Sequence, residues 1–198
     1  MIKIDNKINS SHDVLVLLSG GIDSASLVHY HLSKGESVSA IFFDYGQVTN
    51  KLEYQSARAI SNHYDISLEK VKFDFEIRND EGEFLGRNAL FILVAVNFLK
   101  GSKSYLSIGI HSGTPYYDST PVFINNIQSV MDGYSSGTIR VSAPFLNYSK
   151  KQVLEYALKE KVPIHLTYSC EVGESGPCGL CLSCLDRGML DGELSRRS

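Results

Sequence analysis

The sequence lacks the features that would place the chain in a membrane or on a nucleic acid. No apolar run approaches the ~20 residues that a helix needs to cross a bilayer. Lys and Arg number 19 against 22 Asp and Glu, so the formal net charge of −3 gives no general attraction to nucleic acids or anionic lipids. Residues 1–13 also lack the basic-then-apolar order of a secretory signal. We therefore expect a cytoplasmic protein without membrane contact or direct nucleic-acid binding.

Cysteine is scarce, and it is confined to one segment. The four cysteines follow the order Cys170-x7-Cys178-x2-Cys181-x2-Cys184. Disulfides are not expected in a reducing cytosol, whereas four thiols at this spacing can surround one tetrahedral Zn²⁺. An iron–sulfur cluster is the main alternative, because three cysteines at x2 intervals also suit one. Four thiolates leave no open coordination position, so we expect a structural metal.

Two common phosphate-binding motifs, the Walker loop and G-x-G-x-x-G, are also missing. Instead, the apolar run at residues 14–18, which is typical of a strand buried on both faces, ends in Ser-Gly-Gly. Helical spacing of apolar residues follows Ser24, and Asp23 or Ser24 is predicted to cap the first turn. The two glycines could form only a turn. The nearby hydroxyls and the free N–H groups of a helix start favour an anion site, most naturally for phosphate.

Strand and helix patterns alternate along the chain. Strands are predicted at residues 14–18, 38–43, 67–73, 105–110 and 139–141, and helices from residue 24 and at 52–63, 88–99, 121–131, 149–159 and 182–190, with a polar stretch at 76–83. Helices between successive strands imply parallel pairing through right-handed crossovers. We therefore expect a Rossmann-like α/β fold with an open, doubly wound parallel sheet over residues 1–165, followed by a zinc-binding segment with four cysteine ligands over 166–198.

Polar residues are predicted to meet at the carboxyl edge of this sheet, where such folds bind ligands. They are Asp44, Arg87, Asn88, His111, Asp118 and Lys150. Each has a structural alternative: a turn or helix cap for the two aspartates and the asparagine, a surface charge for the lysine and arginine, and a satisfied core position for the histidine. An arginine at the start of so apolar a helix is better explained by an anionic ligand or a buried carboxylate.

The order Ser-Gly-Gly-Ile-Asp-Ser at residues 19–24 resembles the loop of the adenylating PP-loop ATPases. That resemblance implies that ATP is split into AMP and pyrophosphate, with AMP placed on a substrate oxygen. Carried over by motif, the ATP site would consist of Leu18, Ser19, Gly20, Gly21, Ile22, Asp23, Ser24, Ala25, Ser26, Leu27 and Val28, together with Asp44.

Further motifs in the same order are similar to those of the QueC family of 7-cyano-7-deazaguanine synthases, over residues 14–187. They are Phe-Asp-Tyr-Gly-Gln at 43–47, Gly-Arg-Asn-Ala-Leu-Phe at 86–91, Tyr-Tyr-Asp at 116–118, Ala-Pro-Phe at 143–145 and the cysteine cluster. The resemblance implies adenylation of 7-carboxy-7-deazaguanine, displacement of AMP by ammonia to give the amide, and a second adenylation and dehydration to the nitrile. It also implies Mg²⁺ and a homodimer.

The resemblance assigns roles to single residues. The catalytic group would be Ser19, Asp23, Ser24 and Lys150, with Asp23 positioning the phosphates through Mg²⁺. The deazaguanine would contact Tyr45, Gln47, Arg87, Asn88, His111 and Asp118.

The sequence also departs from the family pattern. The segment before Gly-Arg-Asn is shorter, and Tyr117-Asp118-Ser119-Thr120 stands where the family has Tyr-Pro-Asp-Cys-Arg. Relatives in antiphage defence operons suggest a second function, in which the activated deazaguanine is joined to a protein amine, an N-terminus. A nucleotide-binding regulatory subunit and a tRNA-thiolating PP-loop enzyme are further alternatives; metal-bound cysteines and the absence of a basic face argue against the latter.

Overall fold

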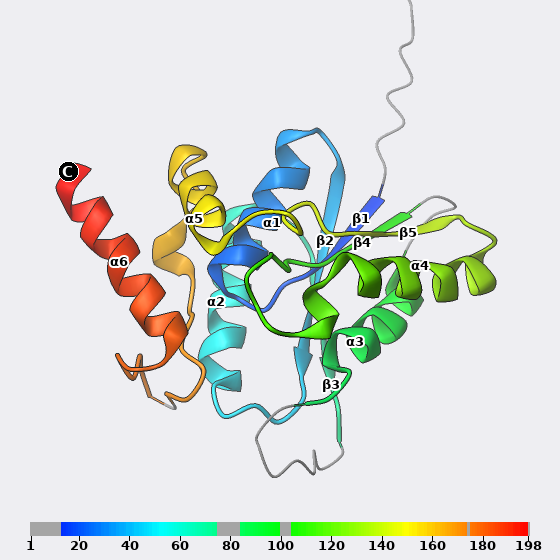
Figure 1. Cartoon of the computed structure of the whole chain (residues 1–198), viewed down its shortest axis with the longest axis horizontal. Helices are drawn as coiled ribbons and strands as arrows, with labels where there is room; N and C mark the ends of the chain where they lie inside the picture. Colours follow the sequence, from blue (N-terminus) through cyan, green and yellow to red (C-terminus); the bar gives the residue numbers. More distant parts are fainter. Residues whose placement is uncertain (1–12, 75–83, 100–103, 174, 198) are drawn as a thin grey trace, which may run out of the picture.

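Five parallel strands form a single sheet in the order β3-β2-β1-β4-β5. The structure is a computed structural model that describes residues 13–74, 84–99, 104–173 and 175–197 (Figure 1). The strands are β1 (Asp13–Leu17), β2 (Ser37–Asp44), β3 (Leu68–Lys72), β4 (Ser104–Ser107) and β5 (Ile139–Ser142). The predicted open parallel α/β sheet is confirmed. The expectations for residues 1–12 and 76–83 lie outside the described residues.

The central strand β1 is buried on both faces, as its unbroken apolar run predicts. Val14 and Val16 pack with helices α1 (Ile22–Ser33), α2 (Asn50–His63) and α5 (Lys150–Lys159). Leu15 and Leu17 pack on the opposite face with α3 (Arg87–Ala95) and α4 (Pro121–Ser135), and Figure 1 shows these two helix layers on either side of the sheet. Each such side chain stabilises the fold by roughly 1.5–3 kcal/mol, so the strand that precedes the Ser-Gly-Gly loop is rigidly held.

Several predicted boundaries shift in the structure. Strand β4 ends at Ser107 rather than residue 110, because Gly109 passes close to the first turn of α1, where a Cβ atom would lie 3.3 Å from the Ser24 nitrogen. Helix α3 continues into a 3-10 turn, η1 (Val96–Phe98), and α6 (Leu182–Arg197) extends beyond residue 190. None of the helices in the described ranges is both long and apolar enough to cross a membrane.

The predicted helix caps are wrong at three places. Helix α1 begins after Gly21, so Asp23 and Ser24 lie inside its first turn. Helix α3 begins after Gly86, whose φ of +73° suits glycine, and Asn88 therefore lies within the helix. Helix α4 is capped by Thr120, whose hydroxyl accepts a hydrogen bond from the Phe123 N–H at 3.2 Å, and not by Asp118. These side chains are consequently free of capping roles.

Candidate active site at the carboxyl edge of the sheet

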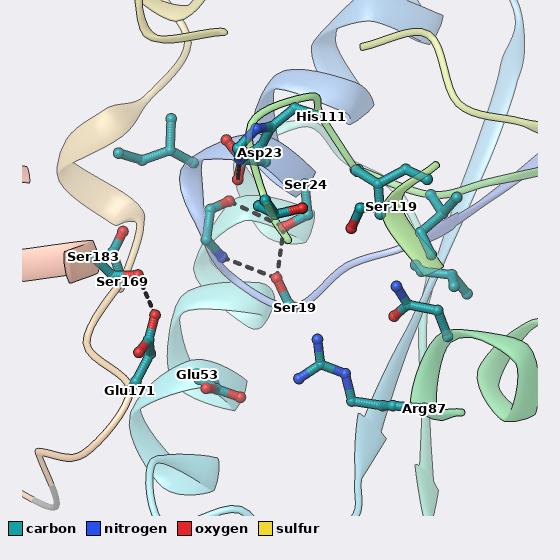
Figure 2. Close-up of a pocket in the computed structure, with 18 of the residues that line it drawn as sticks. Ser19, Asp23, Ser24, Glu53, Arg87, His111, Ser119, Ser169, Glu171 and Ser183 are labelled. Atoms are coloured by element: carbon teal, nitrogen blue, oxygen red, sulfur yellow. Dashed lines mark hydrogen bonds and ion pairs between the residues drawn. The ribbon is translucent and has the colours of Figure 1, made fainter. Parts of the chain in front are cut away.

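A cavity of about 710 Å³ opens at the carboxyl edge of the sheet. Its wall is built by the loops after β1, β2 and β4, the start of α3, and the C-terminal segment that follows η3 (Ile164–Leu166). Figure 2 shows Ser19 between Arg87 on one side and Glu171 and Ser183 on the other. The volume lies in the range of small-molecule sites, and the position is where doubly wound sheets bind ligands.

The loop after β1 presents hydroxyl groups and a helix start to this cavity. The Ser24 hydroxyl donates to the Gly21 carbonyl at 3.0 Å and lies 3.2 Å from the Ser19 hydroxyl. Gly20 adopts a φ of +89° and packs so tightly against α2 that a Cβ atom would lie 2.5 Å from the Glu53 carbonyl oxygen. The N–H groups in the first turn of α1 face a site that favours negative charge. This arrangement suits a phosphate group.

Three charged or titratable side chains meet beside the loop. The Lys150 ammonium donates to both carboxylate oxygens of Asp23 at 2.8 Å, although the two residues are 127 positions apart. His111 Nε2 lies 3.9 Å from the same carboxylate, while its Nδ1 lies 2.8 Å from the Ser112 carbonyl oxygen. The structure therefore brings together three residues that the sequence predicted for the site, and it places His111 at the end of the cavity beside the loop after β1.

Not every residue of the predicted ATP segment reaches the cavity. Residues 18, 19 and 21–24 line it, whereas Gly20 contributes only backbone behind its wall. Ala25, Ser26, Leu27 and Val28 are fully buried in the core and do not line the described cavity. The reason is the helical turn after Ser24, which directs these side chains under the loop. In this structure they pack beneath the loop, and their predicted contact with ATP stays a prediction.

Two predicted aspartates also lie off the cavity wall. Asp44 ends β2, and its carboxylate pairs with Lys70 of the neighbouring strand at 2.9 Å. Asp118 lies in a 3-10 turn, η2 (Tyr117–Ser119), where its backbone carbonyl accepts from the Asn88 side chain at 3.3 Å. Neither residue lines the cavity. The Asp44 carboxylate is paired with the neighbouring strand, and Asp118 contacts the site residue Asn88 only through its backbone carbonyl.

Gln47 holds the loop after β2 with both ends of its side chain. Its amide oxygen accepts from the Tyr45 N–H at 2.9 Å, and its amide nitrogen donates to the Phe43 carbonyl at 3.1 Å and to Glu53 at 2.9 Å. Glu53 also accepts from the Thr49 hydroxyl at 2.6 Å and lines the cavity. Sequence reasoning missed this glutamate, which lies on a helix where a charge ordinarily indicates a solvated face.

The opposite wall is aromatic and carries one guanidinium group. The Phe43 and Phe91 rings stack with their centroids 4.4 Å apart, and Tyr45 packs against Phe91 at 5.4 Å. The Arg87 side chain approaches the Tyr45 hydroxyl at 3.5 Å, and Asn88 is buried beside it. Burial raises the pKa of Tyr45, partly offset by the Arg87 charge, so its hydroxyl stays protonated at neutral pH. The wall offers a flat surface and a cation.

The four cysteines of the C-terminal segment converge as predicted. Their sulfur atoms all lie within 4.8 Å of one another, and the Cys178 and Cys184 sulfurs are 3.9 Å apart. Tetrahedral zinc–thiolate geometry, with bonds near 2.3 Å, places sulfur atoms about 3.8 Å apart. Burial alone would raise the pKa of Cys170, but backbone N–H donors, led by that of Cys178, lower it to about 6. The donor set fits a single four-coordinate metal ion.

Residues next to these cysteines form a part of the cavity wall that the sequence did not indicate. They are Ser169, Glu171, Leu182, Ser183 and Asp186. The Ser183 hydroxyl donates to the Glu171 carboxylate at 2.6 Å (Figure 2). This bond links α6 to the loop that begins at Cys170 and ends at Cys178, here called the cysteine loop. Their location depends on how the C-terminal segment folds back onto the sheet, which the local sequence pattern does not predict.

Comparison with known proteins identifies the family. The family described as "Queuosine biosynthesis protein QueC" matches residues 13–82 and 83–190. The chain belongs to the QueC family. A 7-cyano-7-deazaguanine synthase from Prochlorococcus marinus (strain MIT 9312) is 30% identical over 203 residues, covering 86% of this chain and 89% of that protein. The corresponding enzyme of Aquifex aeolicus (strain VF5) is 31% identical over 208 residues, covering 89% of this chain and 95% of that protein.

The solved structures that resemble this chain share less of its sequence. The U34-tRNA thiolase NcsA from Methanococcus maripaludis, solved with its 4Fe-4S cluster, is 16% identical with a TM-score of 0.49; the match covers 93% of this chain and 65% of that chain. A predicted tRNA methyltransferase subunit from Methanocaldococcus jannaschii is 17% identical with a TM-score of 0.49, covering 74% of each chain. This chain thus spans under two thirds of NcsA.

Proposed function

We propose that this QueC-family enzyme adenylates 7-carboxy-7-deazaguanine with ATP and couples the activated carboxyl to ammonia. The products would be the amide and then, after a second adenylation and dehydration, 7-cyano-7-deazaguanine, with AMP and pyrophosphate released. About 30% identity to 7-cyano-7-deazaguanine synthases over most of both chains supports the substrate. The observation that carries the reaction type is the Ser19–Ser24 loop at a helix start on the wall of the cavity.

At the phosphate end, the proposed chemistry depends on charge. A carboxylate is a poor electrophile, and adenylation turns its oxygen into a leaving group for attack by an amine. The loop N–H groups and the Lys150 ammonium would stabilise the departing pyrophosphate, with Ser19 and Ser24 as further donors. Asp23 would hold Mg²⁺ with phosphate oxygens, as a single carboxylate commonly does, and the ion would neutralise pyrophosphate charge.

At the opposite wall, the proposed substrate contacts are polar groups beside a flat apolar surface. The Arg87 guanidinium suits the substrate carboxylate, and the stacked rings of Phe43 and Phe91 suit a planar base. Tyr45 and Asn88 complete this proposed contact set. Gln47 would act by positioning Tyr45, since hydrogen bonds within the loop occupy both its amide oxygen and its amide nitrogen.

We propose Zn²⁺ for the cysteine cluster. Its compact sulfur arrangement supports one ion bonded to all four thiolates, whereas a cubane cluster bonds each thiolate to a different iron atom and needs them farther apart. Cys170, Cys178, Cys181 and Cys184 would hold the ion, which would close the C-terminal segment against the active-site wall.

Mass spectrometry of a reaction with ATP, Mg²⁺, 7-carboxy-7-deazaguanine and ammonium tests the function. Nitrile together with AMP is the expected result. Accumulation of the amide or adenylate would point instead to a protein amine as the acceptor, and absence of AMP would overturn the assignment. Arg87→Gln should lower kcat/KM for the carboxylate more than tenfold without changing the KM for ATP, whereas Arg58→Gln, an exposed arginine on α2, should change neither.

We also propose the homodimer that the family resemblance implies, with α4 at its interface. Val122, Val130 and Tyr134 are 59%, 43% and 83% exposed along one side of the helix. Asp132 is the only charged residue of α4, and its carboxylate lies 3.7 Å from the Arg140 guanidinium, so its charge is partly balanced within the same chain. Val122→Glu should shift the mass measured by light scattering toward a monomer, while Val48→Glu, at an equally exposed position outside α4, should not.

A further inference from the structure

Tyr168 joins the C-terminal segment to the backbone of the loop at residues 19–24, here called the phosphate loop. Its N–H donates to the Gly20 carbonyl at 3.0 Å. Gly20 is pressed against α2 on its other side, and a Cβ atom at Gly21 would lie 3.7 Å from the Tyr168 carbonyl oxygen. The glycine pair therefore lies between helix α2 and Tyr168, so the position of Tyr168 determines where the loop carbonyl points.

The side chain of Tyr168 contacts the cysteine loop. Its hydroxyl donates to the carbonyls of Gly173 and Gly176 at 2.9 and 3.2 Å. The N–H groups of Gly173 and Cys178 in turn donate to the Cys170 sulfur at 3.2 and 3.3 Å. The hydroxyl thus fixes the chain that connects the first cysteine to the second, and a single residue touches both the phosphate loop and the cysteine loop.

A second contact fixes the helix that carries the last cysteine. Arg187 of α6 donates to the hydroxyl and the carbonyl of Thr167 at 2.9 and 3.3 Å. Cys184 belongs to the same helix, three residues earlier. The residue before Tyr168 is therefore tied to α6, and movement of the cysteine cluster would be transmitted to Tyr168 from both sides.

We propose that Tyr168 is a positioning residue that couples metal binding at the cysteine cluster to ATP binding at the phosphate loop. The metal-loaded loop holds Tyr168 in the place where its N–H meets Gly20, and an occupied phosphate loop restrains the same contact. Because coupling between two sites is reciprocal, ATP must strengthen retention of the metal by the factor by which the metal strengthens ATP binding. The inference rests on the proposed function in one respect, that the loop binds ATP.

The test is the zinc affinity of the protein, measured by equilibrium competition with a chromogenic chelator, with and without saturating ATP and Mg²⁺. Couplings of this kind are typically about 5-fold or more, so ATP should lower the Kd for zinc by at least about 5-fold in the wild type. Tyr168→Phe keeps the N–H and the ring but removes the hydroxyl. It should bind zinc more weakly and lose most of the effect of ATP on the Kd for zinc. Tyr30→Phe removes a hydroxyl that accepts from Lys34 and lies outside the described cavity, and it should behave as the wild type.

Calorimetric titration of ATP separates the two ways in which the test could fail. If ATP binds but leaves the Kd for zinc of the wild type unchanged, the coupling is refuted while the proposed function stands. An undiminished effect of ATP on the Kd for zinc in Tyr168→Phe would refute the role of the hydroxyl. Absence of ATP binding would instead refute the proposed function. Should Tyr168→Phe fail to fold, the wild-type comparison alone decides whether coupling exists.

Discussion

Replacement of Gly20 by alanine tests how tightly the phosphate loop is confined. The backbone there has a φ of +89°, and the new Cβ atom would lie 2.5 Å from the Glu53 carbonyl oxygen and 3.1 Å from the Ala57 nitrogen. The unfavourable φ costs about 1–2 kcal/mol. Overlap with helix backbone, which cannot rotate away as a side chain can, adds about 1–3 kcal/mol. The free energy of unfolding should therefore fall by about 2–5 kcal/mol in Gly20→Ala.

Gly46→Ala is the matched control for this substitution. Gly46 has a φ of +83°, but nothing lies within 4 Å of a Cβ atom built there, so only the backbone cost of about 1–2 kcal/mol should appear. Urea unfolding of both metal-loaded variants, followed by circular dichroism, gives the difference. If the two variants agree within about 0.5 kcal/mol, the loop is not confined by α2 and the reasoning from close packing is refuted.

Three further predictions concern charge, metal and pH. Lys150→Ala should lower the rate of pyrophosphate release about 100-fold, because it removes the ammonium group proposed to stabilise the departing pyrophosphate; Lys151→Ala, with its side chain 80% exposed, should leave the rate unchanged. Cys181→Ser should lower the free energy of unfolding by more than about 4 kcal/mol in chemical denaturation, since metal binding contributes to folding, and a folded, zinc-free, active variant would contradict this. Burial lowers the pKa of His31 below its ordinary 6.5 despite the neighbouring Glu36, so as the pH falls His31 is protonated in the unfolded chain before it is protonated in the folded protein. The free energy of unfolding should therefore be level above about pH 7 and fall as the pH drops below 6.5. The fall should be smaller in His31→Gln.

Periodicity predicted the fold because burial determines it. The unbroken apolar run of β1 and the helical spacing after it are direct records of which faces pack into the core. The direction of a single side chain at the sheet edge cannot be predicted from periodicity in this way. Asp44 follows a buried strand as the motif requires, yet it pairs with Lys70 of the neighbouring strand, and that pairing depends on register between strands.

The phosphate loop and its lysine were predictable for a different reason. Ser19 and Asp23 lie in a short motif, and Lys150 opens a helix at the same edge of the sheet, so topology alone brings them together. The wall formed by Glu171 and Asp186 was not predictable, because it depends on contacts of the cysteine segment with distant backbone. Such contacts leave no periodic trace in the sequence.

The separation of 127 positions between Asp23 and Lys150 has a consequence for the order in which the protein matures during translation. Synthesis at roughly 5–20 residues per second separates the emergence of these two residues by roughly 6–25 s. Strand β1 can pair with β4 only after β4 has been synthesised, so one edge of β1 is unpaired in the early nascent chain. The Asp23 carboxylate likewise lacks the Lys150 ammonium until the end of that interval. The described cavity wall is therefore complete only after the cysteine segment has left the ribosome, because that segment supplies part of the wall.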